Sequence, residues 1–304
     1  MIVYRELSSL AADLGFSGKA LYSLSNHMER HYRTAEIPKG NGELRQLLIP
    51  DPFLMAVQRS ILRTLLVWEE ISPYATAYRP GGSPRVNARP HVGRARVLKL
   101  DIRKFFDHLY YPLVKERAFP AERYSEANRV LLSLLCVYRN ALPQGAPTSP
   151  ALSNIILKDF DNRIGAWCRE RRLVYTRYCD DMTFSGDWDP QEIRVQVQAE
   201  LKPLGLFLNG RKTAVLGPGN RMTVTGLVVN EKLSVPASYR RKLRQELYYC
   251  RKYGISGHLA RVGVKMEGQE YLRRLLGQVR YVLSVDPENR EMQGYEAWLR
   301  GQLV

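Results

Sequence analysis

The sequence is poor in cysteine, and none of its four cysteines lies in a Cys-x-x-Cys pair. This spacing argues against a structural zinc site and a disulfide framework, and it favours free thiols in a reducing cytosol. No uninterrupted apolar run reaches the roughly 18 residues needed to cross a bilayer. Residues 1–16 lack the basic segment and apolar core of a secretory signal. We therefore expect a cytoplasmic protein with no membrane partner.

Acidic residues are also scarce, because 30 Asp and Glu stand against 46 Lys and Arg, which gives a net charge of +16. The excess is concentrated: residues 79–104 hold eight basic residues and one acid, and residues 240–252 hold six and one. One such run is typical of a solvated helix face. Two runs of one sign in so basic a chain favour a polyanion, and nucleic acid is the natural partner.

The 304 residues suggest about two domains, and a hydrophobic share of 45% excludes wholesale disorder. Apolar periodicity predicts helices in two pieces within 3–32, over 52–68 and 194–204, and from 236 onward. Extended patterns predict a hairpin over 37–49 around a Gly-Asn-Gly centre, and strands at 97–102, 173–178 and 222–230. The Pro- and Gly-rich residues 79–90 are predicted to be mostly loop. This mixture predicts an α+β fold.

Three carboxylates stand out by their surroundings. Asp101 ends an apolar strand, and Asp180 and Asp181 are adjacent between two strand-forming segments. An isolated Asp-Asp pair is typical of an exposed turn. Here the flanking residues are apolar, and acids clustered on a core-packed hairpin repel one another unless cations neutralise them. Mg²⁺ suits such oxygen ligands, and two ions about 3.5–4 Å apart promote in-line phosphoryl displacement. The pattern suggests nucleotidyl transfer.

At these residues the chain resembles the reverse transcriptase family. The A, B and C motifs are resembled, in order, by residues 100–107 (LDIRKFFD), 142–150 (LPQGAPTSP) and 178–181 (YCDD). Fingers motifs and motif D are resembled by residues 37–45 with Gln58, and by residues 205–209 (GLFLN) with Lys212. The resemblance runs from about Tyr32 to Val229, and its Pro-Gln-Gly and Asp-Asp elements together are highly specific.

The resemblance implies a right-hand polymerase fold of the α+β class. This fold has fingers, a palm built of an antiparallel sheet plus helices, and a helical thumb. The N-terminal helices and fingers would take residues 1–95, and the palm residues 96–232 with a fingers segment near 112–142. Residues 233–304 would form the thumb.

The resemblance also implies catalytic roles. Asp101, Asp180 and Asp181 would hold two Mg²⁺ ions as metal ligands. Lys212 would protonate the departing pyrophosphate, and a surface cation beside Arg211 is the alternative. Cys179 stands where alanine is commoner in the family, and because both residues are small the turn is expected to survive.

Four residues are expected to bind the incoming deoxynucleotide: Lys39, Arg45, Phe106 and Gln144. Lys39 and Arg45 would clamp the triphosphate, with solvated hairpin charges as the alternative. Phe106 holds the position of the sugar-selecting aromatic, where a ring leaves no room for a 2′-hydroxyl. Core packing is the alternative, which the adjacent Phe105 serves better. Gln144 would shape the pocket over base and template, and Gly145 beside it permits close backbone approach.

Two elements resemble the bacterial retron branch. Residues 87–91 (NARPH) match an Asn-Ala-x-x-His pattern before the A motif, and residues 224–226 (VTG) match a Val-Thr-Gly element after motif D. Asn87 and His91 are therefore expected to contact RNA or to serve a branch-specific architecture. Pro90 fits this segment if Asn87 caps a helix whose first turn contains the proline.

The basic C-terminal region is expected to bind RNA. Arg240, Arg241 and Lys242 would grip a nucleic-acid backbone, as would Arg273 and Arg274. Four tyrosines interleave with these cations: Tyr239, Tyr248, Tyr249 and Tyr253. Stacking on unpaired bases and packing in a thumb core are both open for them.

Within this branch, the resemblance implies an RNA-directed DNA polymerase that acts in antiphage defence. It would copy a dedicated structured non-coding RNA into branched RNA-linked single-stranded DNA (msDNA), starting from a guanosine 2′-hydroxyl. Its partners would be that RNA and its DNA product, deoxynucleotides, a separate host ribonuclease H and an accessory effector protein.

Two alternatives stay open. One is another bacterial reverse transcriptase of the group II intron-like type, against which the Val-Thr-Gly element counts. The other is a catalytically inactive RNA-binding relic, against which the three acids with Gln144 and Lys212 count.

Overall fold

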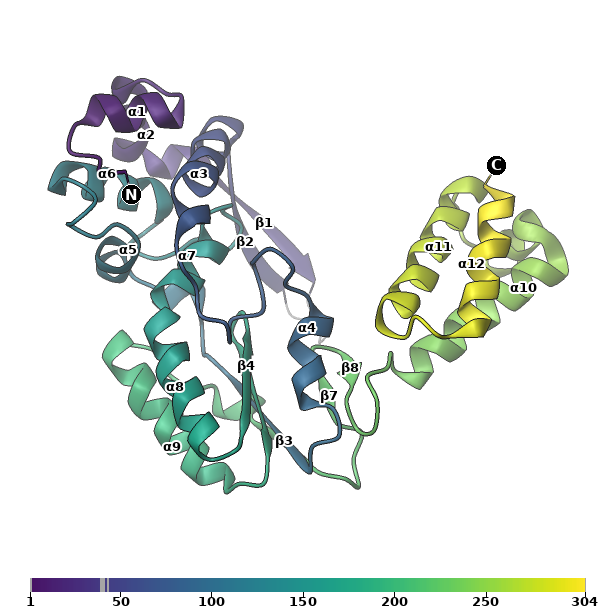
Figure 1. The fold of residues 1–304 in the computed structure, drawn as a ribbon. Coiled ribbons are helices and arrows are strands. Elements are labelled where there is room, and N and C mark those ends of the chain that lie inside the picture. Colours follow the sequence, from purple (N-terminus) through teal and green to yellow (C-terminus); the bar gives the residue numbers. More distant parts are fainter. Residues whose placement is uncertain (1, 39–41, 43, 304) are drawn as a thin grey trace. The chain divides into compact units, whose positions relative to one another are not determined.

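The computed structural model describes residues 2–38, 42 and 44–303 of the chain. The chain forms two compact units (Figure 1). The first comprises Met1–Gly82 and Leu98–Val215, and the second comprises Ser83–Val97 and Leu216–Val304. Each unit has its own hydrophobic core. The predicted site residues are thereby divided between two bodies.

The first unit begins with the predicted pair of helices and the predicted hairpin. Its opening elements are α1 (Leu7–Leu14), α2 (Gly18–Asn26), η1 (Met28–His31), β1 (Tyr32–Pro38), β2 (Leu44–Pro50), α3 (Pro52–Thr64) and η2 (Leu66–Trp68). Ser17 begins α2 by accepting a hydrogen bond from the Ala20 amide at 3.2 Å. Asp51 does the same for α3, accepting from the Leu54 amide at 2.8 Å. Strands β1 and β2 pair antiparallel, which confirms the hairpin, but most of its predicted Gly-Asn-Gly centre lies outside the described residues.

A four-stranded sheet carries the acidic residues, with the strand order β4-β5-β3-β6. Its strands are β3 (Arg96–Asp101), β4 (Val174–Tyr178), β5 (Asp181–Gly186) and β6 (Ala214–Leu216). The β4–β5 pair is antiparallel with Tyr178 opposite Asp181, so Cys179 and Asp180 form a two-residue turn. The strands predicted at 97–102 and 173–178 and the acidic hairpin are confirmed.

The remaining helical segments of the first unit alternate with these strands along the chain. They are η4 (Phe106–His108), α5 (Tyr111–Ala118), α6 (Glu126–Cys136), α7 (Ser149–Ile156), α8 (Lys158–Glu170), α9 (Pro190–Leu201), η5 (Lys202–Leu204) and η6 (Gly210–Lys212). Helices α8 and α9 lie side by side along the sheet (Figure 1). The helix predicted at 194–204 is confirmed, with a start four residues earlier at Pro190, where the Asp189 side chain caps it.

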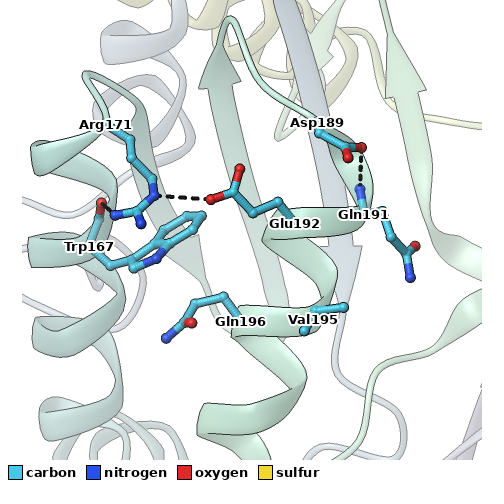
Figure 2. Close-up of a pocket in the computed structure, with 7 residues that line it drawn as sticks. All are labelled: Trp167, Arg171, Asp189, Gln191, Glu192, Val195 and Gln196. Carbon is cyan, nitrogen blue, oxygen red and sulfur yellow. Dashed lines mark hydrogen bonds and ion pairs between the residues drawn. The ribbon is translucent and has the colours of Figure 1, made fainter.

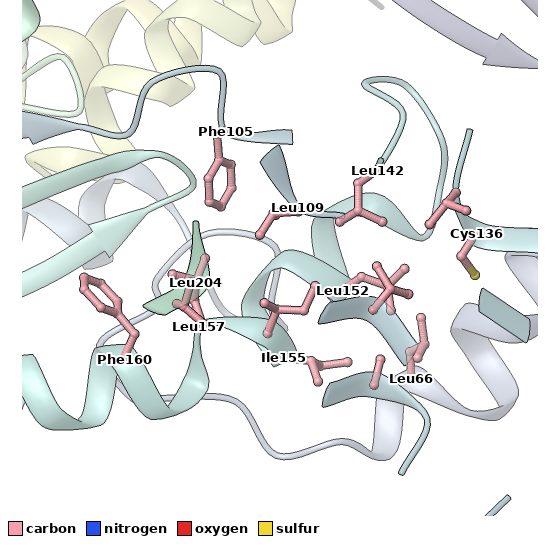
Figure 3. Packing of buried hydrophobic residues seen from close by; sticks show 14 of the residues in the cluster. Leu66, Phe105, Leu109, Cys136, Leu142, Leu152, Ile155, Leu157, Phe160 and Leu204 are labelled. Atoms are coloured by element: carbon pink, nitrogen blue, oxygen red, sulfur yellow. The ribbon is translucent and has the colours of Figure 1, made fainter. Parts of the chain in front are cut away.

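Apolar side chains beneath the sheet join segments that are far apart in the sequence. Figure 3 shows Phe105 and Leu109, which follow the strand of Asp101, in one cluster with Leu142, Leu152 and Phe160. All five side chains are buried. Burial of such side chains from water is the main stabilising contribution here. The core thereby holds the segment after Asp101 against the loop that precedes α7.

The second unit contains a short helical segment, a small hairpin and three longer helices. Its elements are α4 (Pro84–Ala88), η3 (Arg89–His91), β7 (Thr223–Val224), β8 (Leu227–Val228), α10 (Ala237–Val262), α11 (Gly268–Val285) and α12 (Arg290–Gln302). The helical C-terminal region is confirmed. Helix α10 bends at Gly254, whose φ of 71° lies outside the helical region. No helix in the ranges that the structure describes is long and apolar enough to span a membrane.

Three local predictions in this unit are wrong. Residues 84–91 are helical rather than loop, because Pro84 starts α4 favourably and Ser83 accepts a hydrogen bond from the Val86 amide at 3.2 Å. Asn87 therefore lies inside α4 and does not cap it, while Pro90 falls in η3. The strand predicted at 222–230 is two strands, since Thr225 and Gly226 both adopt positive φ and turn the chain back.

Helix α9 offers a test of the packing of the first unit. Ile193 is fully buried, whereas Val195 on the same helix is 60% exposed. We expect Ile193→Ala to lower the free energy of unfolding by about 2–5 kcal/mol, and Val195→Ala to change it by less than about 0.5 kcal/mol. Urea denaturation followed by circular dichroism measures both. Equal losses in the two variants would contradict the orientation of α9.

Candidate active site

The structure brings Asp101 and the acidic turn together at one end of the sheet. Asp101 is the last residue of β3, and its carboxylate is almost completely buried. The next amide, that of Ile102, donates a hydrogen bond to the Asp180 carbonyl at 3.1 Å. The backbone itself therefore joins the two parts of the predicted catalytic triad, which are about eighty residues apart in the chain.

The Asp101 carboxylate has two polar partners from one neighbouring segment. Lys212 donates from Nζ to Oδ2 at 2.6 Å, and Asn209 donates from Nδ2 to Oδ1 at 2.9 Å. The Asn209 amide also donates to the Asp101 carbonyl at 2.8 Å. This segment is the one that resembles motif D. Lys212 thus contacts Asp101 while 62% of its side chain is exposed, and its role in protonating pyrophosphate stays a prediction.

The electrostatics of the site follow from three acids close to one another. The pKa of Asp181 rises from 3.8 to about 6, first through partial desolvation and then through the charges of Asp180 and Asp101. Lys212 and Lys99 act in the opposite direction. The pKa of Lys212 is raised, chiefly by its hydrogen bond to Asp101. Desolvation lowers the pKa of Lys99.

Cys179 occupies the tight position of the acidic turn. Its φ of 62° lies in the left-handed region, which costs a non-glycine residue conformational energy. The Tyr78 hydroxyl donates a hydrogen bond to its Sγ at 3.3 Å. Burial raises the pKa of the Cys179 thiol to about 12, so the group is neutral at pH 7. The turn does survive with cysteine, as the sequence predicted.

Two of the predicted nucleotide-binding residues, Arg45 and Gln144, lie on segments that contact each other. The Leu48 amide of β2 donates to the Gln144 carbonyl at 2.8 Å. At Gly145, with a φ of 126°, a Cβ atom would lie 2.7 Å from the Leu48 carbonyl oxygen, so a side chain there would clash with the backbone of β2. Arg45 is exposed on β2. Lys39 lies outside the described residues.

The adjacent phenylalanines after Asp101 have different environments. Phe105 is 4% exposed and belongs to the core, as expected. Phe106 is half-buried, and its ring centroid lies 5.2 Å from that of Phe105. Part of the Phe106 ring therefore remains available to a ligand, and its predicted role in sugar selection stays a prediction.

The predicted RNA-binding residues of the second unit differ in exposure. Asn87 and His91 are fully buried, and burial together with Arg94 lowers the pKa of His91 to about 3. Their burial favours the architectural alternative, and RNA contact by them stays a prediction. Arg241 and Lys242 are exposed on α10, and Arg240 is half-buried.

The tyrosines of α10 form a partly exposed cluster. The rings of Tyr249 and Tyr253 stack with centroids 5.9 Å apart, and Tyr248 meets Tyr249 edge to face at 5.4 Å. The Lys252 ammonium lies over Tyr248 and Tyr253, at 5.8 and 5.3 Å from their centroids. Tyr248 is 52% exposed. The contacts between the rings support packing in a thumb core, and the exposure of Tyr248 supports stacking on unpaired bases, so both alternatives stay open.

A surface cavity of about 420 Å³ between α8 and α9 contains none of the predicted residues. Figure 2 shows Arg171 lying over the Trp167 ring and bonded to Glu192. The cavity is open to solvent, and its lining includes both positively and negatively charged side chains. The predicted catalytic and nucleotide-binding residues that the structure describes therefore lie outside this cavity.

The acidic residues suit a divalent cation that completes its shell with substrate oxygens. Within the described residues, no three acidic, histidine or cysteine side chains are placed so that they alone could hold an ion. Mg²⁺ commonly takes only one or two carboxylates and adds substrate phosphates and water. Such a cation would offset the desolvation and the neighbouring negative charges that raise the pKa of Asp181.

A strand-end carboxylate, an acidic turn and a lysine at one sheet end are typical of nucleotidyl-transferring polymerases. A family model described as reverse transcriptase (RNA-dependent DNA polymerase) matches residues 37–229. The chain is 34% identical to the retron Mx65 reverse transcriptase of Myxococcus xanthus, over 95% of this chain and 70% of that protein. It is 31% identical to the retron Ec86 reverse transcriptase of Escherichia coli, over 81% of this chain and 78% of that one.

The chain therefore belongs to the reverse transcriptase family, and its activity is RNA-directed DNA polymerisation. This confirms the predicted α+β reverse transcriptase fold and the resemblance to retron reverse transcriptases. Sequence reasoning missed several residues around the acids: Tyr78, Lys99, Asn154, Asp161, Arg177, and a role for Asn209. Asn209 lies inside the segment that resembles motif D, which is a usable signal. The others have no local pattern that marks them.

The raised pKa of Asp181 predicts a pH dependence of stability. The native state holds this proton more tightly than the unfolded state, so the contribution is complete below about pH 4 and is lost as the pH rises through about 6. In metal-free buffer, Asp181→Asn should therefore lose less thermal stability than wild type between pH 4 and pH 7. The difference should be small, because the Asp181 side chain is exposed.

Thermal unfolding at several pH values, with a chelator present, measures this effect. Asp187→Asn is the matched control, since Asp187 is exposed just beyond the end of β5. A wild-type pH profile in the Asp181 variant would show that the fold does not perturb this carboxyl.

Proposed function

We propose that this enzyme copies a dedicated structured RNA into branched, RNA-linked single-stranded DNA by two-metal nucleotidyl transfer. The observation that carries the proposal is the junction of Asp101 with the Asp180–Asp181 turn in a chain similar to retron reverse transcriptases. Synthesis would start from a guanosine 2′-hydroxyl of the RNA, in the cytoplasm. A host ribonuclease H would remove copied template, and an accessory effector protein would couple the enzyme to antiphage defence.

The domain roles follow the same proposal. Residues 1–95 would supply the N-terminal helices and fingers, and residues 96–232 the palm, with a fingers segment near 112–142. Residues 233–304 would form the thumb and bind RNA through Arg240, Arg241 and Lys242. Phosphate contacts from such cations position a nucleic acid and release counterions. Asn87 and His91 would support this branch-specific architecture from inside the second unit.

Asp101, Asp180 and Asp181 would hold two Mg²⁺ ions, which acidify the primer hydroxyl and neutralise the triphosphate. These acids would be positioned before substrate arrives, since the Ile102 amide beside β3 donates a hydrogen bond to the Asp180 carbonyl. Arg45 and Lys39 would bind the triphosphate. Gln144 would contact the incoming nucleotide from a loop that β2 holds in place.

Lys212 would deliver a proton to the departing pyrophosphate. In the free enzyme its hydrogen bond to Asp101 raises its pKa and keeps it charged. Cations held by Asp101 would compete with this hydrogen bond and would weaken its stabilisation of the charged amine. The lysine then becomes a better acid at the stage at which the leaving group needs a proton.

Nucleic acid that copurifies with the protein tests the product. Expressed together with its neighbouring genomic region, the wild-type enzyme should yield RNA joined covalently to single-stranded DNA. Asp101→Asn, which removes a charge without changing volume, should copurify with RNA but no joined DNA. Sequencing after ribonuclease treatment measures both. DNA without a branch would support another reverse transcriptase type, and RNA alone from both proteins would support a binding relic.

Phe106 tests sugar selection. If its half-buried ring lies under the incoming sugar, Phe106→Ala opens room for a 2′-hydroxyl, and ribonucleotide incorporation should rise relative to deoxynucleotide incorporation by about tenfold or more. The measurement is kcat/KM for a matched pair of nucleotides in primer extension. Phe105→Leu, a change within the core, is the control that should keep the wild-type ratio. An unchanged ratio in Phe106→Ala would make the ring a packing residue.

A further inference from the structure

Arg177 carries a fully buried charge and lies two residues before Cys179, at the end of β4 that leads into the acidic turn. It lies on β4, and each of the three nitrogens of its guanidinium donates at least one hydrogen bond. Nε and Nη2 bind the Asp161 carboxylate of α8, with the shortest distance 2.6 Å, and Nη2 also donates to Asn154 Oδ1 at 3.2 Å. The remaining nitrogen, Nη1, donates to the Cys179 carbonyl at 2.9 Å.

Burial of the Arg177–Asp161 ion pair has a desolvation cost, so the pair is weak evidence of a purely stabilising role. Both side chains are 0% exposed, and burying two charges is often less stabilising than apolar packing of the same volume. Asp161 is held further by the Tyr175 hydroxyl at 2.7 Å. The pair thereby fixes the direction of the guanidinium, so that its third nitrogen, Nη1, donates to the Cys179 carbonyl.

That carbonyl belongs to the strained residue of the acidic turn. Cys179 has a positive φ, and a conformation of this kind persists only when its surroundings hold it. Arg177 holds its carbonyl and Tyr78 its sulfur, while Ile102 holds the carbonyl of the next residue, Asp180. The turn is therefore fixed from β4 on one side and from the strand of Asp101 on the other.

The same network reaches a segment that flanks β4. Tyr74 accepts from the Arg177 amide, and the Thr76 amide donates to the Arg177 carbonyl, each at 2.8 Å. Asn154 donates through Nδ2 to the Ala77 carbonyl at 2.8 Å. Residues 74–78, which end at Tyr78, are thus locked to Arg177 and its partners. The backbone hydrogen bonds of residue 177 do not depend on its side chain. A substitution at Arg177 would therefore remove the Cys179 contact directly and would reach the Tyr78 segment only through Asn154.

We propose that Arg177 is a positioning residue that sets the Asp180–Asp181 turn against Asp101 through its hydrogen bond to the Cys179 carbonyl. The inference rests on the proposed two-metal function, because a mispositioned turn matters only if these acids share cations. Catalysis would then depend on the buried Arg177–Asp161 ion pair, although the pair itself contacts no substrate. A positioning role predicts loss of metal affinity and turnover beyond any loss of stability.

Arg177→Lys separates the two kinds of loss. Lysine keeps the charge beside Asp161, but its single ammonium cannot serve Asp161 and the Cys179 carbonyl as a rigid fork does. We expect binding of Mn²⁺ alone, measured by electron paramagnetic resonance without nucleotide, to weaken by about tenfold or more. In primer extension, kcat should fall by a similar factor, with partial rescue at high Mg²⁺. Amide exchange of residues 178–181 should accelerate in the metal-free protein.

Arg129→Lys is the matched control. Arg129 is also buried in the first unit, where it binds Glu126 and Glu116 at 2.8 and 2.9 Å and the Phe119 carbonyl at 2.7 Å. Its replacement should lower the melting temperature while Mn²⁺ affinity and kcat stay at wild-type values. A second variant, Arg177→Met with Asp161→Asn, removes both charges and should fold stably yet show the weakened Mn²⁺ binding.

The outcomes are distinct. Wild-type Mn²⁺ affinity and kcat in folded Arg177→Lys would overturn the positioning role and leave the proposed function standing. Failure of both Arg177 variants to fold would make the residue a folding determinant and would equally overturn it. Absence of Mn²⁺ binding and of primer extension in the wild-type protein would instead remove the proposed function itself, and the inference with it.

Discussion

The close placement of Asp101 beside the Asp180–Asp181 turn is the constraint on which the rest of the site depends. The backbone forces these acids together, since Ile102 binds the Asp180 carbonyl one residue beyond Asp101. Desolvation, together with the charges of Asp180 and Asp101, raises the pKa of Asp181. Lys212 and Asn209 hold the carboxylate of Asp101, the buried one of these three acids. In the free protein a lysine therefore supplies positive charge where cations are proposed to bind.

Polar groups that contact the residue before the two adjacent acids support this acidic site. The buried Arg177–Asp161 pair and the Tyr78 hydroxyl converge on Cys179, the residue that precedes the two adjacent acids. Apolar packing supplies the rest, because Phe105 and Leu142 tie the segment after Asp101 to the loop of Gln144 (Figure 3). The close approach of Gly145 to Leu48 then joins that loop to the hairpin of Arg45.

The sequence predicted the parts of the site that have local patterns. Strand alternation and the adjacent aspartates were enough for the acidic hairpin, and motif order was enough for the association of Asp101 with it. Arg177 and Asp161 were missed because their pairing depends on how α8 lies against β4, which no spacing in the chain reveals. Single-residue conformations were also decisive: Ser83 rather than Asn87 starts α4, and Thr225 with Gly226 divides a predicted strand in two.

The central claim is that the three acids act as one catalytic unit in RNA-directed DNA synthesis. Extension of an annealed DNA primer on an RNA template in Mg²⁺ tests it most directly, with wild type and Asp180→Asn compared at equal RNA binding. We expect synthesis by wild type and a loss of at least about a hundredfold in the variant, since one carboxylate is lost without a change of volume. Equal rates from the two proteins would contradict it.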